Sequence, residues 1–217
     1  MSCCAPKEIE RQFGSDTAKG DLRRFRRRGP IRSTRLLIDD LRKAGVAGMS
    51  VLDIGGGIGA IHHALLDAGA VDAMHVDLSP EYIAAAREEA ARRGHADRVR
   101  FVHGDFVTVS ADLPSADVLT LDRVICCYPD MELLVGRAAE KARKLVGAVY
   151  PRDVWWVRLG VRLGNVVRRI RRTAFRVFVY RPAAIDDALR RHGFERRTQR
   201  RTFLWEVVTY TCDLPQS

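Results

Sequence analysis

Residues 51–60 read VLDIGGGIGA, a short apolar run that ends in a glycine-rich turn. The apolar residues 51–54 are typical of a buried strand. Glycines that follow a strand let the backbone approach a ligand closely, and the start of the next helix offers unpaired N–H groups. The stretch therefore predicts a strand, a ligand-binding turn and a helix over residues 58–68.

Further strands and helices alternate along the chain after this turn. Strands are expected over 73–78, 99–105, 116–122 and 144–151, and a helix over 80–93 starts at the capping Ser79 and ends before Gly94. This alternation predicts parallel strands with helices on both faces of the sheet. Residues 194–202 and 203–211 follow each other closely and predict an antiparallel hairpin, with Phe203, Trp205, Val207 and Thr209 on one face.

Composition is that of a soluble globular protein, with 47% apolar and 29% charged residues among 217. The net charge of +10, carried mostly by arginine, favours an acidic partner such as nucleic acid, an anionic membrane surface or a small acid. The five cysteines form no disulfide framework, and no signal peptide or membrane span is evident. We therefore expect a cytoplasmic protein with reduced thiols.

Two cofactor classes fit the glycine turn. Gly55-x-Gly57-x-x-Ala60 matches the dinucleotide fingerprint, and both classes expect a ribose-binding acid such as Asp77 after the second strand. Asp53, however, would repel a pyrophosphate and would suit a ligand with an ammonium and a sulfonium. Residues 104–106 (Gly-Asp-Phe) place an acceptor and a ring where an adenine would lie. A tight turn without a ligand is the third possibility.

These features together resemble the class I S-adenosylmethionine-dependent methyltransferases, whose D-x-G-x-G-x-G motif is matched at residues 53–59. The resemblance implies a Rossmann-like α/β fold with a seven-stranded, mostly parallel sheet, helices on both faces and a C-terminal antiparallel hairpin. It also implies S-adenosyl-L-methionine as the cofactor. The implied cofactor-binding residues are Asp53, Gly55, Gly56, Gly57, Gly59, Asp77, Leu78, Asp105, Phe106, Asp122 and Arg123.

A narrower resemblance points to the magnesium-protoporphyrin IX O-methyltransferases. It rests on the basic arm at 21–30, the LDRVICCYP segment at 121–129, the YPRDVWW segment at 150–156 and the ALRRHGF segment at 188–194. In that group a histidine is expected where this chain has Cys127. The segment after the fourth strand also lacks the Asn/Asp-Pro-Pro-Tyr/Phe sequence typical of enzymes that methylate exocyclic or amide nitrogens of nucleic acid and protein.

No catalytic base is assigned, since a carboxylate acceptor is a sufficient nucleophile at pH 7, whereas an alcohol or phenol needs its proton removed. Tyr128 and Cys127 are weak candidates for a catalytic role. Cys126 and Cys127 lack the further ligands of a metal site even with Cys3 and Cys4 added, so no metal is predicted. They are expected to line a pocket, with binding of a trivalent metalloid as an alternative. The adjacent histidines at 62 and 63 are expected on the surface.

The domain organisation is predicted as a basic helical arm or cap over 1–44 and a methyltransferase domain over 45–217, with a substrate lid over 153–181. Within that lid, apolar residues recur at spacings of four, four, three and four among arginines: Trp155, Leu159, Leu163, Val166 and Ile170. This pattern indicates an amphipathic helix that packs on the sheet, covers the substrate or lies on an anionic membrane.

The sequence thus favours an S-adenosylmethionine-dependent methyltransferase that acts on a small molecule, by O-methylation of an acidic, hydrophobic acceptor such as a porphyrin carboxylate. An RNA methyltransferase is the alternative, for which the positive charge is the main argument. A NAD(P)-dependent oxidoreductase is less favoured because of Asp53 and the terminal hairpin. The identity of the acceptor and the oligomeric state do not follow from the sequence.

Overall fold

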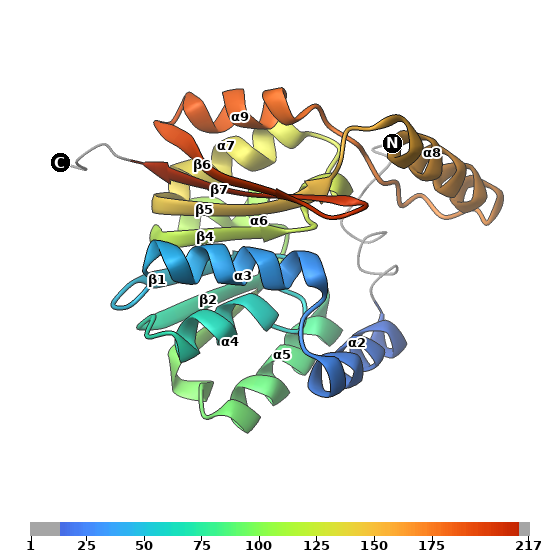
Figure 1. Ribbon diagram of the computed structural model, residues 1–217. Coiled ribbons are helices and arrows are strands. Elements are labelled where there is room, and N and C mark those ends of the chain that lie inside the picture. The colour runs from blue at the N-terminus through green and yellow to red at the C-terminus, as the bar shows by residue number, and fades with distance from the viewer. Residues whose placement is uncertain (1–13, 213–217) are drawn as a thin grey trace.

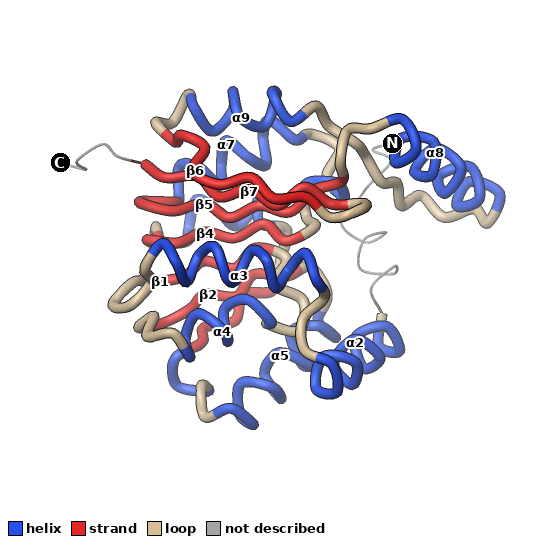
Figure 2. Tube along the Cα trace, in the orientation of Figure 1, coloured by secondary structure: helices blue, strands red, loops and turns tan. Residues whose placement is uncertain are grey.

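A seven-stranded sheet forms the centre of the protein in a computed structural model that describes residues 14–212 (Figures 1 and 2). The strand order is β3-β2-β1-β4-β5-β7-β6. Strands β1 to β5 are parallel, and β7 runs antiparallel to both of its neighbours. The strands are β1 Ser50–Ile54, β2 Asp72–Asp77, β3 Val99–His103, β4 Ala116–Asp122, β5 Ala142–Pro151, β6 Phe194–Arg201 and β7 Trp205–Cys212. The predicted fold class is confirmed.

Helices cover both faces of this sheet, as its buried parallel strands require. One face packs against α3 and α4, and the other packs against α6, α7 and α9 (Figure 1). The helices are α2 Ser15–Arg28, α3 Arg32–Ala44, α4 Ala60–Asp67, α5 Pro80–Arg93, α6 Phe106–Val109, α7 Met131–Lys141, α8 Trp155–Ile170 and α9 Pro182–Arg190. Short 3₁₀ turns are η1 Ala96–Arg98, η2 Ser110–Asp112 and η3 Ile125–Cys127. Each of the described helices is too short or too polar to cross a bilayer.

Local sequence signals located most of these elements. Helix α5 begins where Ser79 accepts a hydrogen bond from the Tyr82 N–H, and its bounds match the predicted 80–93. Helix α7 was not predicted, because Gly136 interrupts a short pattern. Its start signal was nevertheless present, since Asp130 caps the helix by accepting from the Leu133 N–H at 3.0 Å.

The terminal hairpin departs from prediction at one residue. Val207 and Thr209 are buried on one face as expected, but Phe203 lies in the turn between β6 and β7 and is 74% exposed. The turn is closed by the Thr202 N–H, which donates to the Trp205 carbonyl at 2.8 Å. Phe203 fits the alternation of apolar residues that continues through Trp205 and Val207, so the sequence pattern did not show that β7 begins only at Trp205.

Helix α3 belongs to the layer that covers the sheet. Leu37 and Leu41 are fully buried against β5. They reach it because Gly147 has no side chain: a Cβ at that position would lie 2.8 Å from the Leu37 Cδ1. Helix α2 instead packs against α5 through Ala18, Leu22 and Phe25. The predicted division of the chain at residue 44 stays a prediction.

Truncation of Leu37 should show how much the fold depends on this contact. We expect Leu37→Ala to lower the free energy of unfolding by about 2–5 kcal/mol, because the cavity left beside Gly147 cannot be filled by a neighbour. Leu159→Ala is the matched control, because Leu159 is 48% exposed on α8. Equal losses for both variants in urea-induced unfolding would contradict the packing described here.

Candidate active site

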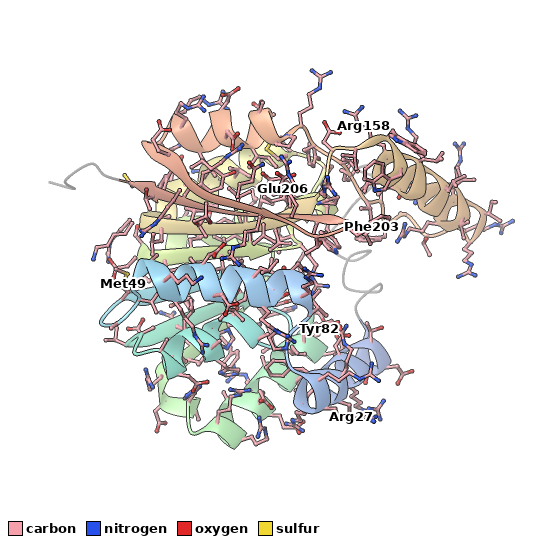
Figure 3. All side chains as sticks on the ribbon, viewed as in Figure 1. Arg27, Met49, Tyr82, Arg158, Phe203 and Glu206 are labelled. Carbon is pink, nitrogen blue, oxygen red and sulfur yellow. The ribbon has the colours of Figure 1, made fainter. Side chains whose placement is uncertain are left out.

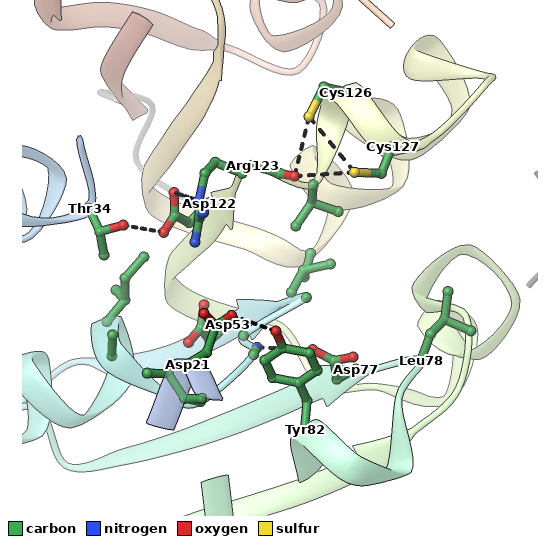
Figure 4. A pocket seen from close by; sticks show the side chains of 18 of the residues that line it. Asp21, Thr34, Asp53, Asp77, Leu78, Tyr82, Asp122, Arg123, Cys126 and Cys127 are labelled. Carbon is green, nitrogen blue, oxygen red and sulfur yellow. Dashed lines mark hydrogen bonds and ion pairs between the residues drawn. The ribbon is translucent and has the colours of Figure 1, made fainter. Parts of the chain in front are cut away.

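A cavity of about 390 Å³ lies where the parallel strands end (Figure 4). The ends of β1, β2 and β4 and the turn after β3 form its floor, as expected for ligand sites in open α/β sheets. Of the predicted cofactor residues, all but Gly59 line this cavity: Asp53, Gly55, Gly56, Gly57, Asp77, Leu78, Asp105, Phe106, Asp122 and Arg123. Gly59 is instead the N-cap of α4. The weak catalytic candidates Cys127 and Tyr128 also line it.

The glycine turn is fixed by the carboxylate of Asp77. Its Oδ2 accepts a hydrogen bond from the Gly57 N–H at 2.9 Å, and its Oδ1 accepts from the Ser79 N–H at 2.9 Å. Gly57 has φ +56°, a conformation that a residue with a side chain adopts at a cost. Burial raises the pKa of Asp77 above its ordinary value. Asp77 therefore presents a pre-oriented acceptor to the cavity at the end of β2.

Asp53 borders the cavity, but protein donors engage both of its oxygens. Thr120 Oγ1 on β4 donates to Oδ1 at 2.6 Å, and His62 Nδ1 on α4 lies 2.9 Å from Oδ2. Burial raises the pKa of Asp53. The sequence predicted that Asp53 faces the cofactor; in the structure it also ties the glycine turn to β4 and α4.

The expected surface position of His62 and His63 is wrong. Both are completely buried and pack together with His75 and the nearly buried His95. Burial lowers the pKa of His62 and of His75 to about 3, so these rings are neutral at pH 7. Helix α4 is only eight residues long and is buried on most of its surface, so its sequence pattern did not identify an exposed side.

This histidine cluster contains a group with ligand-type atoms close together. Atoms of Asp53, His62 and His75 lie within 4.8 Å of one another. We assign no metal to them, because both carboxylate oxygens of Asp53 already accept protein hydrogen bonds. The predicted absence of a metal site stays a prediction, and Cys3 and Cys4 lie outside the described residues.

Asp105 and Tyr128 meet in the lining of the cavity. Asp105 caps α6 by accepting from the Val107 N–H at 3.1 Å, and the Tyr128 hydroxyl donates to Asp105 Oδ2 at 3.2 Å. Burial and the nearby Asp105 charge raise the pKa of Tyr128 to about 12. A protonated phenol donates hydrogen bonds and is a poor general base at neutral pH, so the geometry favours a positioning role for Tyr128.

The end of β4 holds a strained residue beside a buried acid. Arg123 has φ +63°, and its N–H donates to the Val149 carbonyl at 2.9 Å. Left-handed backbone at a residue other than glycine costs about 1–3 kcal/mol and tends to occur at functional sites. Burial raises the pKa of Asp122, which accepts from Thr34 Oγ1 at 2.6 Å through Oδ2. The buried Asp122 Oδ1 has no hydrogen-bond partner; the Arg123 Nε lies 3.5 Å from it.

Cys126 and Cys127 lie on the next turn, η3, and line the cavity as predicted. Their sulfur atoms are 3.8 Å apart, and each lies within hydrogen-bonding distance of the Arg123 carbonyl, at 3.4 and 3.5 Å. Contact with Cys127 and burial raise the pKa of Cys126. Contact with Cys126 and the positive charges of Arg123 and Arg168 lower the pKa of Cys127.

The N-terminal helices supply a wall of the cavity that sequence reasoning missed. The lining residues from this region are Asp21, Arg24, Phe25, Gly29, Pro30, Ile31 and Thr34. The Tyr82 hydroxyl donates to Asp21 Oδ2 at 2.6 Å, and Arg26 pairs with the buried Glu89 at 2.9 Å, so α2 is anchored on α5. The sequence showed a basic helix here, but it contains no local signal for contacts across more than sixty residues.

The cavity is rich in acids although the whole chain is basic. Five carboxylates line it: Asp21, Asp53, Asp77, Asp105 and Asp122. Burial raises the pKa of three of these, which means that their charge is poorly solvated. A cationic ligand relieves this cost, whereas the pyrophosphate of a dinucleotide increases it. These carboxylates therefore fit a cofactor that carries an ammonium and a sulfonium.

Residues 51–147 match the family model described as a methyltransferase domain. This match includes the glycine turn and the end of β4, and it agrees with the resemblance of the sequence to the class I S-adenosylmethionine-dependent methyltransferases. Among curated proteins it is similar to the ribosomal protein L11 methyltransferase of Geobacter metallireducens, with 33% identity over 114 residues, or 52% of this chain and 34% of that protein. The corresponding protein of Alteromonas mediterranea is 32% identical over 118 residues, or 50% of this chain and 40% of that protein. The chain thus spans well under half the length of these two relatives.

Solved structures of methyltransferases share the whole fold. Magnesium protoporphyrin IX methyltransferase from Synechocystis, crystallised with S-adenosylhomocysteine, aligns over 94% of this chain and 99% of its own, with a TM-score of 0.72 and 17% identity. A putative sarcosine dimethylglycine methyltransferase from Galdieria sulphuraria aligns over 85% of this chain and 87% of its own, with a TM-score of 0.67 and 13% identity. The Synechocystis protein has also been crystallised with S-adenosylmethionine, which is the cofactor that the sequence of this chain predicts.

Asp77→Asn tests the cofactor site with a side chain of almost the same size, whose amide keeps only one of the two acceptor oxygens that bind the Gly57 and Ser79 N–H groups. We expect S-adenosylmethionine to bind about 10–100-fold more weakly, because hydrogen bonds to a charged acceptor are worth about 1.5–3 kcal/mol. Isothermal titration calorimetry measures the dissociation constant. The control is Asp112→Asn on the exposed turn η2. Unchanged affinity in Asp77→Asn would show that Asp77 does not bind the cofactor.

The buried histidines make stability depend on pH. Unfolded histidine titrates near 6.5, but His62 and His75 titrate at about 3 when folded. Between these values the unfolded chain binds more protons, so the free energy of unfolding falls as pH falls, by up to about 1.4 kcal/mol per pH unit for each histidine. We expect His75→Gln to make this slope shallower in urea unfolding between pH 7 and 5. His192→Gln, at an exposed residue, should keep the parent slope.

Proposed function

We propose that this methyltransferase transfers the methyl group to a carboxylate oxygen of a small, hydrophobic acid and so forms a methyl ester. The observation that carries the proposal is the combination of arginines and apolar side chains that line the cavity in addition to its carboxylates. Arg123 and Arg168 line the cavity together with the apolar side chains of Phe175, Val177 and Trp205. Guanidinium groups recognise carboxylates by charge-assisted hydrogen bonds, and the apolar side chains suit the body of such an acid.

The residues that would hold the cofactor are those of the carboxylate-rich floor. Asp77 would accept from the ribose hydroxyls, and Asp105 from the adenine amino group beside Phe106. Asp122 Oδ1, which lacks a hydrogen-bond partner and lies 3.5 Å from the Arg123 Nε, would accept from the ammonium group. When bound, S-adenosylmethionine supplies an electrophilic methyl group on a positively charged sulfur.

The chain's own residues then have mainly to position the acceptor. A carboxylate is ionised at pH 7, so no proton has to be removed, and alignment of the reacting atoms can supply most of the acceleration. Consistent with this, no histidine or lysine is found among the described residues that line the cavity. An arginine that binds one carboxylate oxygen leaves the other available for methylation.

Likeness to the Synechocystis enzyme, which is named for a porphyrin acceptor, supports the proposal only at the level of the fold. A second candidate is a macromolecular acceptor. The curated relatives are named for ribosomal protein L11, and the net charge of +10 would favour RNA or an RNA-bound protein. The desolvated carboxylates of the cavity count against the oxidoreductase alternative.

The test is a transfer assay with methyl-labelled S-adenosylmethionine. One arm offers hydrophobic mono- and dicarboxylic acids, including a porphyrin, and the other offers ribosomal RNA and isolated ribosomal protein L11. A methyl ester releases labelled methanol on mild alkaline treatment, whereas N-methyl and C-methyl products keep their label. Label that resists alkali, or that appears only on RNA or protein, would overturn the proposal.

Arg168 should affect the acceptor and leave the cofactor unaffected. We expect Arg168→Gln to raise the KM for the acid by about 10–100-fold, since a charge-assisted hydrogen bond is lost. The dissociation constant for S-adenosylmethionine should stay unchanged. Arg169→Gln is the matched control, because Arg169 is the next residue and is exposed. If both variants raised the KM for the acid equally, Arg168 would have no specific part in acceptor binding.

A further inference from the structure

Helix α8 extends away from the body of the protein, at the same end of the sheet as α2 (Figure 1). Most of the large apolar side chains that are exposed in residues 14–212 lie here. Of ten large apolar side chains that are exposed, eight lie on α8 or in the β6–β7 turn. We call these eight the α8 surface: Trp155, Leu159, Leu163, Val166, Val167, Ile170, Phe203 and Leu204. Contiguous exposed apolar patches of this kind mark binding sites.

The opposite side of α8 is already occupied by the chain that follows it. Asn165 exchanges two hydrogen bonds with the backbone of Val177, at 2.8 and 3.0 Å, and the Arg168 guanidinium lies over the Phe175 ring. The apolar stripe therefore points outward, with Trp155 72% and Ile170 75% exposed. The predicted helix is confirmed, but packing of its stripe on the sheet, one of the alternatives raised by the sequence, is wrong.

An aromatic group joins the helix to the hairpin turn. The ring of Trp156 stacks on Phe203 with centroids 6.2 Å apart and meets Trp155 edge to face at 5.8 Å. Figure 3 shows Phe203 at the tip of the hairpin beside the start of α8. Tryptophan and phenylalanine with aliphatic residues on a helix are typical of segments that enter the boundary between lipid headgroups and acyl chains.

The charge around this apolar stripe is mainly positive. Residues 154–185 contain eight arginines and no acid. Helical spacing places Arg162 and Arg169 along one edge of the stripe, beside Arg158, whose charge is paired with Asp153. Arg171 and Arg172 follow the end of α8. Arginines at such an edge can bury their methylene groups beside the apolar residues and keep their charge at the level of phosphates.

We propose that the α8 surface binds the surface of an anionic lipid bilayer, with α8 lying in the plane of the headgroups. A second copy of the chain is a poorer occupant, because pairing two such helices would bring their arginines together. RNA would meet the arginines but leave the aliphatic stripe exposed to water. The inference goes beyond the proposed function and does not depend on which acceptor is methylated. Since Arg168 and Phe175 also line the cavity, binding would bring the cavity close to the bilayer.

The experiment is vesicle flotation of the full chain. Vesicles are phosphatidylcholine alone or phosphatidylcholine with about one third phosphatidylglycerol, and we expect at least tenfold stronger binding to the anionic ones, weakened by salt. The double variant Leu163→Glu/Ile170→Glu should lose at least tenfold in binding. Val71→Glu/Leu133→Glu is the matched control, since it changes two exposed apolar residues elsewhere. Cofactor affinity should be unchanged in both, which shows that the variants are folded.

Tryptophan fluorescence gives a second readout. On addition of anionic vesicles the emission should shift to the blue, and Trp155→Phe should remove most of that shift. Three outcomes would overturn the proposal: equal flotation of the parent and the Leu163→Glu/Ile170→Glu variant, a dimer in solution that this variant dissociates without any vesicle binding by the parent, or binding of RNA but not of vesicles.

Discussion

The buried carboxylate of Asp53 is the point on which the site is built. It accepts a hydrogen bond from Thr120 at 2.6 Å and contacts His62 at 2.9 Å, so one side chain at the end of β1 joins the neighbouring strand and the following helix. An unpaired buried charge is far more costly than a paired one. Thr120 and His62 are therefore held in place beside the Asp53 carboxylate. This arrangement also requires that Gly56 has no side chain, because a Cβ there would lie 2.5 Å from His75 Nδ1 and 2.9 Å from Asp53 Oδ2.

Charge is separated between the inside of the site and the outside of the molecule. Acids with poorly solvated charge line the cavity, whereas most arginines of α2 and α8 lie outside it, with Arg24 and Arg168 as the exceptions. The first arrangement suits a cationic cofactor, and the second raises the local concentration of an anionic partner through long-range attraction. A single sequence can therefore be strongly basic and still bind a cation.

The floor of the site was predictable from the sequence, because each of its residues follows a strand whose end must lie at the same edge of a parallel sheet. Asp77, Asp105 and Asp122 needed no more than the strand pattern and the resemblance to be placed together. The buried position of His62 and the wall formed by Thr34 could not be predicted. They depend on which side of a short helix meets the sheet, and on contacts between segments far apart in the chain. Exposure of the apolar stripe on α8 could not be predicted either. Amphipathic spacing does not show whether the apolar side packs on the sheet, covers the substrate or faces a membrane.

The wall formed by α2 has a consequence for exchange kinetics. Helix α2 buries Ala18, Leu22 and Phe25 mainly against α5, whereas α3 packs against α4 and three strands of the sheet. Segments with few buried contacts open at a lower free energy than the core. Detachment of α2 would break the contact between Tyr82 and Asp21 and expose the cofactor side of the cavity without disturbing the sheet. The residence time of a bound cofactor would then be set by the opening rate of this helix, and α2 would act as a gate that is separate from the wall where the acceptor binds.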